Sequence, residues 1–147
     1  MACQSIVYFS SENNYGKKKV SKYDEMVYEQ KRKLLLKEAE KMIGIPYCYG
    51  GTEGCVDCSA LTQKVYAKIG IQLPRTAEQQ SKLGFVVDFG EVKAGDLLFF
   101  GKGAKVDHVG IYAGNGEIIH ATVSRGVVRE HLEVMSRNLL YAKRLIE

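Results

Sequence analysis

Asp57-Cys58-Ser59-Ala60-Leu61 places a cysteine in the first turn of an amphipathic helix, which we predict over about residues 58–68. Asp57 is the expected N-cap of this helix, and Leu61, Val65 and Ile69 form its buried stripe. A thiol in the first turn faces unpaired backbone N–H groups and the positive end of the helix dipole, which favour its ionised form. Cys58 is therefore the candidate nucleophile.

Two histidines downstream supply the partners that a nucleophilic cysteine needs. His108 opens the strand-like run Asp107-His108-Val109-Gly110-Ile111-Tyr112, and His120 lies within Ile118-Ile119-His120-Ala121. A cysteine, a base and a group that orients the base are the minimum set for covalent acyl transfer.

The turn between these two runs determines whether the histidines meet. A two-residue turn at residues 115–116 would send His108 and His120 to opposite faces of the sheet. A loop over residues 113–115, followed by a left-handed bulge, places His108 directly across from His120. The alternation of apolar and polar residues along 109–113 favours this second arrangement, because it gives one apolar face and one polar, cleft-lining face.

The order of predicted elements, helices first and strands afterwards, indicates an α+β fold. Residues 1–22 form a polar lead-in of uncertain order. A long amphipathic helix follows over about 22–42, with apolar positions at Met26, Leu34, Leu35, Ala39 and Met42. We expect a short helix at about 77–83, capped by Thr76. A meander of short strands is predicted at 85–89, 96–100, 108–113, 117–123, 126–131 and 141–146.

Length and composition fit one domain, because 147 residues with 46% hydrophobic content can bury a single core. The formal charge is +4, and the basic side chains cluster near the N-terminus at Lys17, Lys18, Lys19, Lys22, Lys31, Arg32, Lys33 and Lys37. A solvated helix face is the main interpretation of this cluster. Attraction to an anionic polymer or membrane surface is the alternative. We predict no nucleic-acid partner, since no binding motif accompanies the charge.

The four cysteines allow several arrangements. Cys55 and Cys58 form a C-x-x-C pair that, with Cys48 and a histidine, offers four zinc ligands, but no second close ligand pair is present. A redox pair would need a βαβ setting, and consecutive strands follow instead. We therefore expect no metal and no cofactor. In an oxidising compartment Cys48 could pair with Cys55 and leave Cys58 free, which the sequence alone does not decide.

The beginning of the chain, Met1-Ala2-Cys3-Gln4, lacks the apolar stretch of a secretory signal, and no run of about 18 apolar residues would span a membrane. Either the protein is made for the cytoplasm, or the chain is a mature form without its export signal. A small residue before Cys3 is similar to the end of a bacterial lipoprotein signal, in which Cys3 would carry a lipid and attach the protein to a membrane.

The chain resembles the NlpC-type cell-wall peptidases, a branch of the papain-like cysteine hydrolases, over about residues 43–120. Several motifs occur in the order that this family has. They are Pro46-Tyr47-Cys48-Tyr49-Gly50-Gly51, Asp57-Cys58-Ser59-Ala60-Leu61, Leu73-Pro74-Arg75-Thr76-Ala77, Gln79 or Gln80, Ala94-Gly95-Asp96-Leu97-Leu98-Phe99-Phe100 and Asp107-His108-Val109-Gly110-Ile111-Tyr112. The resemblance implies a papain-like α+β fold, with N-terminal helices packed on a C-terminal antiparallel sheet of about five to six strands. The whole chain, 1–147, would be a single catalytic domain.

The resemblance also assigns roles to individual residues. Cys58 would be the nucleophile, His108 the base and His120 the residue that orients the base. Tyr47, Ser59 and Arg75 would contribute to oxyanion or substrate binding, and Asp96 is expected to be structural.

The implied function is that of a peptidoglycan hydrolase, a cysteine endopeptidase. It would cut stem peptides between D-glutamate and a diamino acid through a thioester intermediate. The expected partners are peptidoglycan stem peptides, the expected state is a monomer, and the expected location is the bacterial cell envelope, periplasmic or secreted. The alternatives are a noncatalytic module that binds cell-wall peptides, and a related amidase or acyltransferase, including a secreted toxin.

Overall fold

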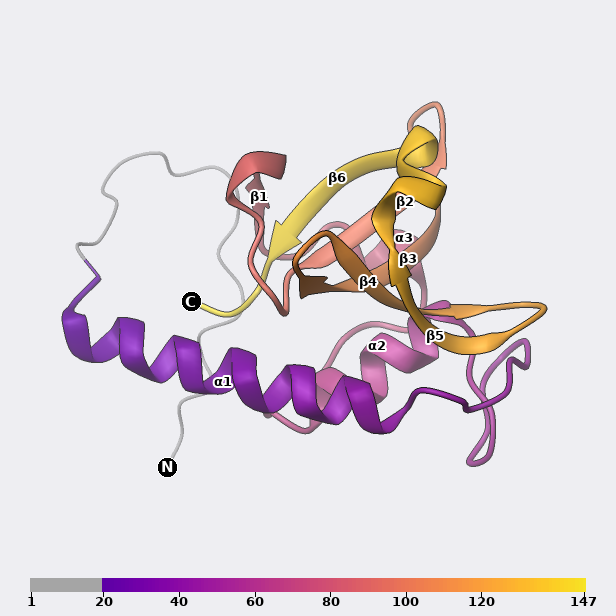
Figure 1. Ribbon diagram of the computed structural model, residues 1–147, viewed down its shortest axis with the longest axis horizontal. Coiled ribbons are helices and arrows are strands. Elements are labelled where there is room, and N and C mark those ends of the chain that lie inside the picture. The colour runs from indigo at the N-terminus through magenta and orange to yellow at the C-terminus, as the bar shows by residue number, and fades with distance from the viewer. Residues whose placement is uncertain (1–19) are drawn as a thin grey trace.

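The computed structural model describes residues 20–147, in which helices pack against one antiparallel sheet (Figure 1). The helices are α1 (Lys22–Lys41), α2 (Cys58–Ala67) and α3 (Ala77–Gln80), with short 3-10 turns at η2 (Phe89–Glu91) and η3 (Leu132–Asn138). The strands are β1 (Phe85–Val87), β2 (Leu97–Lys102), β3 (Lys105–Gly114), β4 (Glu117–Thr122), β5 (Gly126–His131) and β6 (Leu139–Arg144). The predicted α+β architecture of helices followed by an antiparallel sheet is confirmed.

The strand order is β1-β6-β2-β3-β4-β5, so β2 to β5 form the predicted meander, and β1 and β6 depart from it. The last strand, β6, returns to lie between β1 and β2. The predicted strand at 85–89 ends at Val87, because Phe89 enters η2. The last strand begins two residues earlier than predicted, at Leu139.

The first helix, α1, begins at a capping box in which Ser21 and Asp24 satisfy each other's backbone N–H groups. Its predicted apolar stripe is partly wrong, because Met26 is 53% exposed and Leu34 is 44% exposed. In Figure 1 the N-terminal turns of α1 extend past the sheet. The buried face of α1 is instead formed by Arg32, Leu35 and Ala39.

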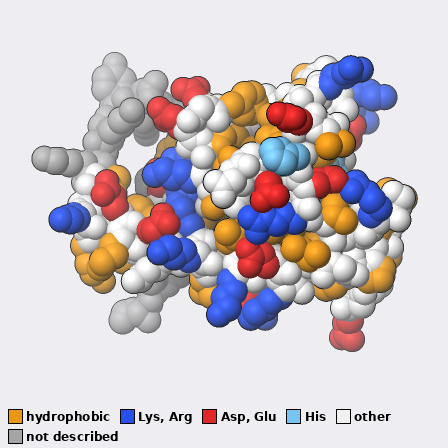
Figure 2. All heavy atoms as spheres, viewed as in Figure 1, with side chains coloured by type: hydrophobic (Ala, Val, Ile, Leu, Met, Phe, Trp, Pro, Cys, Tyr) orange, Lys and Arg blue, Asp and Glu red, His pale blue; other side chains and the backbone are white. Residues whose placement is uncertain are grey.

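Arg32, which belongs to the predicted solvated basic cluster, is buried. Its guanidinium donates to Asp96 Oδ1 at 3.1 Å and to the Ile146 carbonyl at 3.0 Å. Arg144 donates to both oxygens of the same carboxylate. Asp96 is thus a buried structural anion. It links the start of β2 to α1 through Arg32 and to the end of β6 through Arg144. The other charges are more evenly spread: in Figure 2, acidic and basic side chains are interspersed over the face that carries α1.

Both faces of the sheet bury apolar side chains. The main core lies between the helices and one face, where α2 supplies Leu61 and Val65 and β3 supplies Val109 and Ile111. The opposite face was predicted to be polar and cleft-lining. It also holds a smaller apolar cluster, comprising Val87, Leu98, Phe100, Ile118 and Ala142.

The β3–β4 connection differs from the predicted loop, yet it gives the predicted result. Gly114 pairs with Glu117 across a two-residue turn, in which Asn115 and Gly116 have φ values of 53° and 77°. Both central residues of a type I′ turn require positive φ, which is why Asn-Gly favours it. The register then shifts by one residue between Tyr112 and Gly114, and this bulge reverses the alternation. His108 and His120 therefore still share a face. They are not directly paired as predicted, because the strands are offset by two residues from that register.

Residues 1–19 lie outside the part of the chain that the structure describes, and with them most of the predicted lead-in (1–22) and the predicted lipid site at Cys3. Within residues 20–147, no helix combines the length and the apolar character needed to cross a bilayer.

Candidate active site

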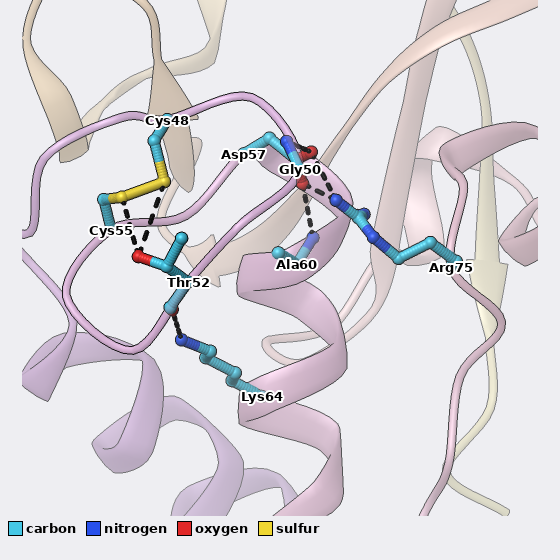
Figure 3. The surroundings of a disulfide bond; sticks show 8 residues. All are labelled: Cys48, Gly50, Thr52, Cys55, Asp57, Ala60, Lys64 and Arg75. Atoms are coloured by element: carbon cyan, nitrogen blue, oxygen red, sulfur yellow. Dashed lines mark hydrogen bonds and ion pairs between the residues drawn. A yellow bond between two sulfur atoms is a disulfide. The ribbon is translucent and has the colours of Figure 1, made fainter.

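The start of α2 is fixed by Asp57, as predicted. Its Oδ1 accepts a hydrogen bond from the Ala60 N–H at 2.8 Å, and its Oδ2 accepts one from the Gly50 N–H at 3.0 Å (Figure 3). Arg75 adds two further bonds, of 3.1 Å and 2.6 Å, to the two oxygens. Burial raises the pKa of Asp57, but the bonds from Arg75, Ala60 and Gly50 outweigh it and hold the pKa below its ordinary value. A charged cap therefore holds Cys58 at the first position of the helix.

A disulfide joins Cys48 to Cys55 and closes the loop that precedes α2 (Figure 3). The two ends of the loop also pair through the backbone, because Cys48 N–H donates to the Val56 carbonyl at 3.2 Å and Val56 N–H donates to the Pro46 carbonyl at 3.0 Å. Thr52 lies inside the loop, with its hydroxyl 3.1 Å from the Cys55 sulfur. The disulfide with Cys48 excludes a zinc or redox role for Cys55 paired with Cys58. Cys58 is the free cysteine among residues 20–147.

A cavity of about 400 Å³ opens beside the start of α2. Its lining includes Tyr47, Cys58, Lys102, Asp107, His108 and Asn138. The structure thus brings the predicted nucleophile, the predicted base and Tyr47 to one cavity. Ser59 and Arg75 lie outside its lining: Ser59 is buried, and its hydroxyl accepts a hydrogen bond from Arg75 at 2.8 Å.

The two histidines are in direct contact. His108 Nε2 lies 2.8 Å from His120 Nδ1, and His120 itself is buried behind His108. The other ring nitrogen of His120, Nε2, lies 2.8 Å from Glu130 Oε1. Arg125 holds that carboxylate with two bonds, of 2.6 Å and 3.0 Å. Four side chains thus form one line of hydrogen bonds that leads away from the cavity.

Sequence reasoning missed Glu130, to which it gave no role. The signal lies in the β4–β5 register: Ile118 pairs with Glu130 and His120 pairs with Val128. Glu130 is therefore a diagonal neighbour of His120 on the same face. Pairing the two predicted strands would have brought it to the histidines.

The pKa values of the predicted nucleophile and base describe a neutral pair. Burial raises the pKa of the Cys58 thiol, although the backbone N–H groups of Val109, Ser59 and Cys58 act in the opposite direction. Burial, together with the adjacent His120, lowers the pKa of His108 to about 4. The N–H groups at the helix start favour the thiolate, as expected, but desolvation of the thiolate outweighs them and leaves the pKa of Cys58 above its ordinary value.

Tyr47 stays protonated at neutral pH. Burial raises the pKa of its phenol, and the nearby Cys58 and Asp57 raise it further. A phenol in this state donates a hydrogen bond. Among the described residues, no three His, Cys, Asp or Glu side chains are grouped as a metal site requires.

Comparisons with known proteins find related sequences. A family model described as "NlpC/P60 family" matches residues 44–144. The bifunctional muramidase/DL-endopeptidase CwlT of Bacillus subtilis is 41% identical over 116 residues, which are 70% of this chain and 35% of that protein. The probable endopeptidase NlpC of Escherichia coli is 41% identical over 108 residues, 69% of this chain and 70% of that one.

Solved structures show the same fold. The peptidoglycan hydrolase RipB of Mycobacterium tuberculosis superimposes with a TM-score of 0.74 at 26% identity, over 92% of this chain and 75% of that one. An NlpC/P60 family protein of Bacillus cereus gives a TM-score of 0.74 at 34% identity, over 79% of this chain and 40% of that one. The chain spans only about a third of the length of the Bacillus subtilis relative.

Proposed function

Because this chain belongs to the NlpC/P60 family, we propose that it is a cysteine endopeptidase that hydrolyses stem peptides of peptidoglycan. The observation that supports this proposal best is the shared cavity of Cys58, His108 and Tyr47. The names of the relatives, a DL-endopeptidase and a peptidoglycan hydrolase among them, support peptidoglycan as the substrate. We propose that the enzyme cleaves the peptide bond between D-glutamate and the diamino acid.

The first step of the proposed reaction is acylation of Cys58. His108 Nε2 is occupied by His120, so Nδ1 is the nitrogen left to take the thiol proton. The sulfur attacks the peptide carbonyl carbon, and the C–N bond then breaks as His108 returns the proton to the leaving amine. In the second step, water gives a proton to His108 and attacks the thioester. The carboxylic acid leaves, and the sulfur recovers its proton.

The charge that develops on the carbonyl oxygen needs donors. The protonated Tyr47 phenol and the backbone N–H of Cys58 at the start of α2 are the proposed oxyanion donors. Both lie beside the nucleophile, since Tyr47 and Cys58 line the same cavity. For Ser59 and Arg75 we propose an indirect role, because both bind Asp57, which holds the start of α2 in place.

We also propose that the protein acts as a monomer at the cell envelope or outside the cell. The Cys48–Cys55 disulfide supports this location, because disulfides persist in oxidising compartments. A lipid on Cys3 remains the proposed route of membrane attachment.

Incubation with purified peptidoglycan, followed by mass analysis of the released fragments, tests the function. Wild-type protein should release fragments cut between D-glutamate and the diamino acid, and Cys58→Ala should release none while keeping its fold. Cys3→Ser, which changes a cysteine outside the described residues, is the matched control and should cleave normally. Cleavage that survives in Cys58→Ala would disprove the proposal.

A further inference from the structure

Glu130 ends the line of hydrogen bonds that begins at His108. The hydrogen bonds from Arg125 are the main reason that the pKa of Glu130 is lowered to about 2. Burial raises this pKa, and the hydrogen bond from His120 lowers it further. Glu130 is therefore a carboxylate at neutral pH, and a carboxylate can only accept hydrogen bonds.

This one anion determines where each proton lies along the line. His120 Nε2 must carry the hydrogen that Glu130 Oε1 accepts at 2.8 Å. A neutral imidazole has a single N–H, so His120 Nδ1 is left as an acceptor. His108 Nε2 must then donate to it across 2.8 Å. The remaining nitrogen, His108 Nδ1, is consequently free of a proton and able to act as a base.

We propose that Glu130 is a positioning residue of this site: anchored by Arg125, it sets the tautomers of His120 and His108 so that His108 presents an unprotonated Nδ1 to the cavity. The proposal rests on the proposed function only for its effect on turnover. The tautomers themselves exist without substrate.

The carboxylate also compensates charge during the reaction. When His108 takes the thiol proton, the line gains a positive charge in a buried place, where unpaired charge is costly. The proton stays on His108, and the carboxylate of Glu130, held by His120 at 2.8 Å, stabilises the charge electrostatically. Glu130 thus stabilises the protonated base through His120, whereas in other triads an acidic residue contacts the base directly.

The experiment compares Glu130→Ala and Glu130→Gln with a matched control. Glu117→Gln removes the same charge from a carboxylate on β4 that bonds Arg129 at 3.1 Å, outside the histidine line. Nitrogen-15 NMR of the imidazoles reads the tautomers directly. In Glu130→Ala, His120 should lose its exclusive Nε2–H form, whereas Glu130→Gln should keep it, because the amide oxygen still accepts the bond. Glu117→Gln should look like wild type.

Kinetics supply the second measurement. Glu130→Ala should lower kcat about ten- to a hundredfold with little change in KM, less than the loss of proton transfer itself would cost. Glu130→Gln should fall between Glu130→Ala and wild type.

The pH dependence of kcat adds a third measurement, because a purely structural effect would not shift its acid limb in a defined direction. Burial lowers the pKa of His120 most, Glu130 raises it against burial through its hydrogen bond and its charge, and Arg125 lowers it further. The charged groups that face His120 are these two, with His108 beside it. The acid limb of kcat should therefore move to lower pH in Glu130→Gln and to higher pH in Arg125→Gln.

An unchanged His120 tautomer in Glu130→Ala would overturn the proposal, as would an equal loss of kcat in Glu117→Gln. Failure of the proposed function looks different. If wild-type protein leaves peptidoglycan intact while the tautomer still changes in Glu130→Ala, the substrate assignment falls and the positioning role stands.

Discussion

Gly110 lies directly against His120, with no room for a side chain between them. A Cβ at position 110 would come within 3.0 Å of the His120 Cβ and 2.5 Å of Ile118 Cδ1. The line of hydrogen bonds from His108 to Glu130 therefore depends on the absence of one carbon atom on the neighbouring strand.

Gly110→Ala should lower both stability and activity. Forcing an extra carbon into a packed site costs about 1–3 kcal/mol, and the displacement here would fall first on the Ile118 side chain and then on His120. Denaturant unfolding and fragment release measure the two effects. Gly90→Ala is the control, since a Cβ there has no heavy atom within 4 Å. Equal behaviour of the two variants would contradict the prediction.

Folding stability should decrease as the pH falls from 6.5 to 4. His108 binds a proton near pH 6.5 in the unfolded chain, whereas burial lowers its pKa to about 4 in the folded one. The unfolded state thus binds more protons in this window, and the loss is on the order of 3 kcal/mol. Denaturant titrations at several pH values measure it. His108→Gln should flatten the dependence, while His131→Gln, which removes an exposed histidine, should keep it.

Alkylation of Cys58 by iodoacetamide should accelerate as the pH rises through neutrality into the alkaline range, because burial raises the pKa of the thiol. Peptide mass analysis distinguishes Cys58 from Cys3. A rate that is already maximal at pH 5 would show that the resting site holds a thiolate, which would contradict a raised pKa of the Cys58 thiol.

Removing the disulfide with Cys48→Ser and Cys55→Ser together should lower the free energy of unfolding by about 2–3 kcal/mol, the chain-entropy value for so short a loop. Activity should fall as well, since Tyr47 pairs with Val56 beside the closed loop. A dithiol reductant should produce the same change in wild type and none in the double variant. A reductant effect of equal size in both would contradict this account.

Local chemistry made part of the site predictable. The cap at Asp57 and the helix that begins at Cys58 depend on neighbours in sequence, so pattern alone locates them. The shared face of His108 and His120 was predicted through the wrong turn, because an Asn-Gly turn and a bulge together preserve the same alternation. Glu130 depends on the pairing of β4 with β5, which no local pattern specifies. Arg32 looked solvated for the same reason: its partner Asp96 lies 64 residues away.

The Arg32–Asp96 contact bears on how this protein should be dissected. The family match begins at residue 44, three residues after α1 ends. A truncated version that starts there would strip one of two cations from a carboxylate sealed inside the protein and leave Arg144 as its remaining partner. Losing part of the compensation of a buried charge destabilises the fold. Loss of activity in that shortened protein would therefore report a weakened scaffold rather than a catalytic role for the helix.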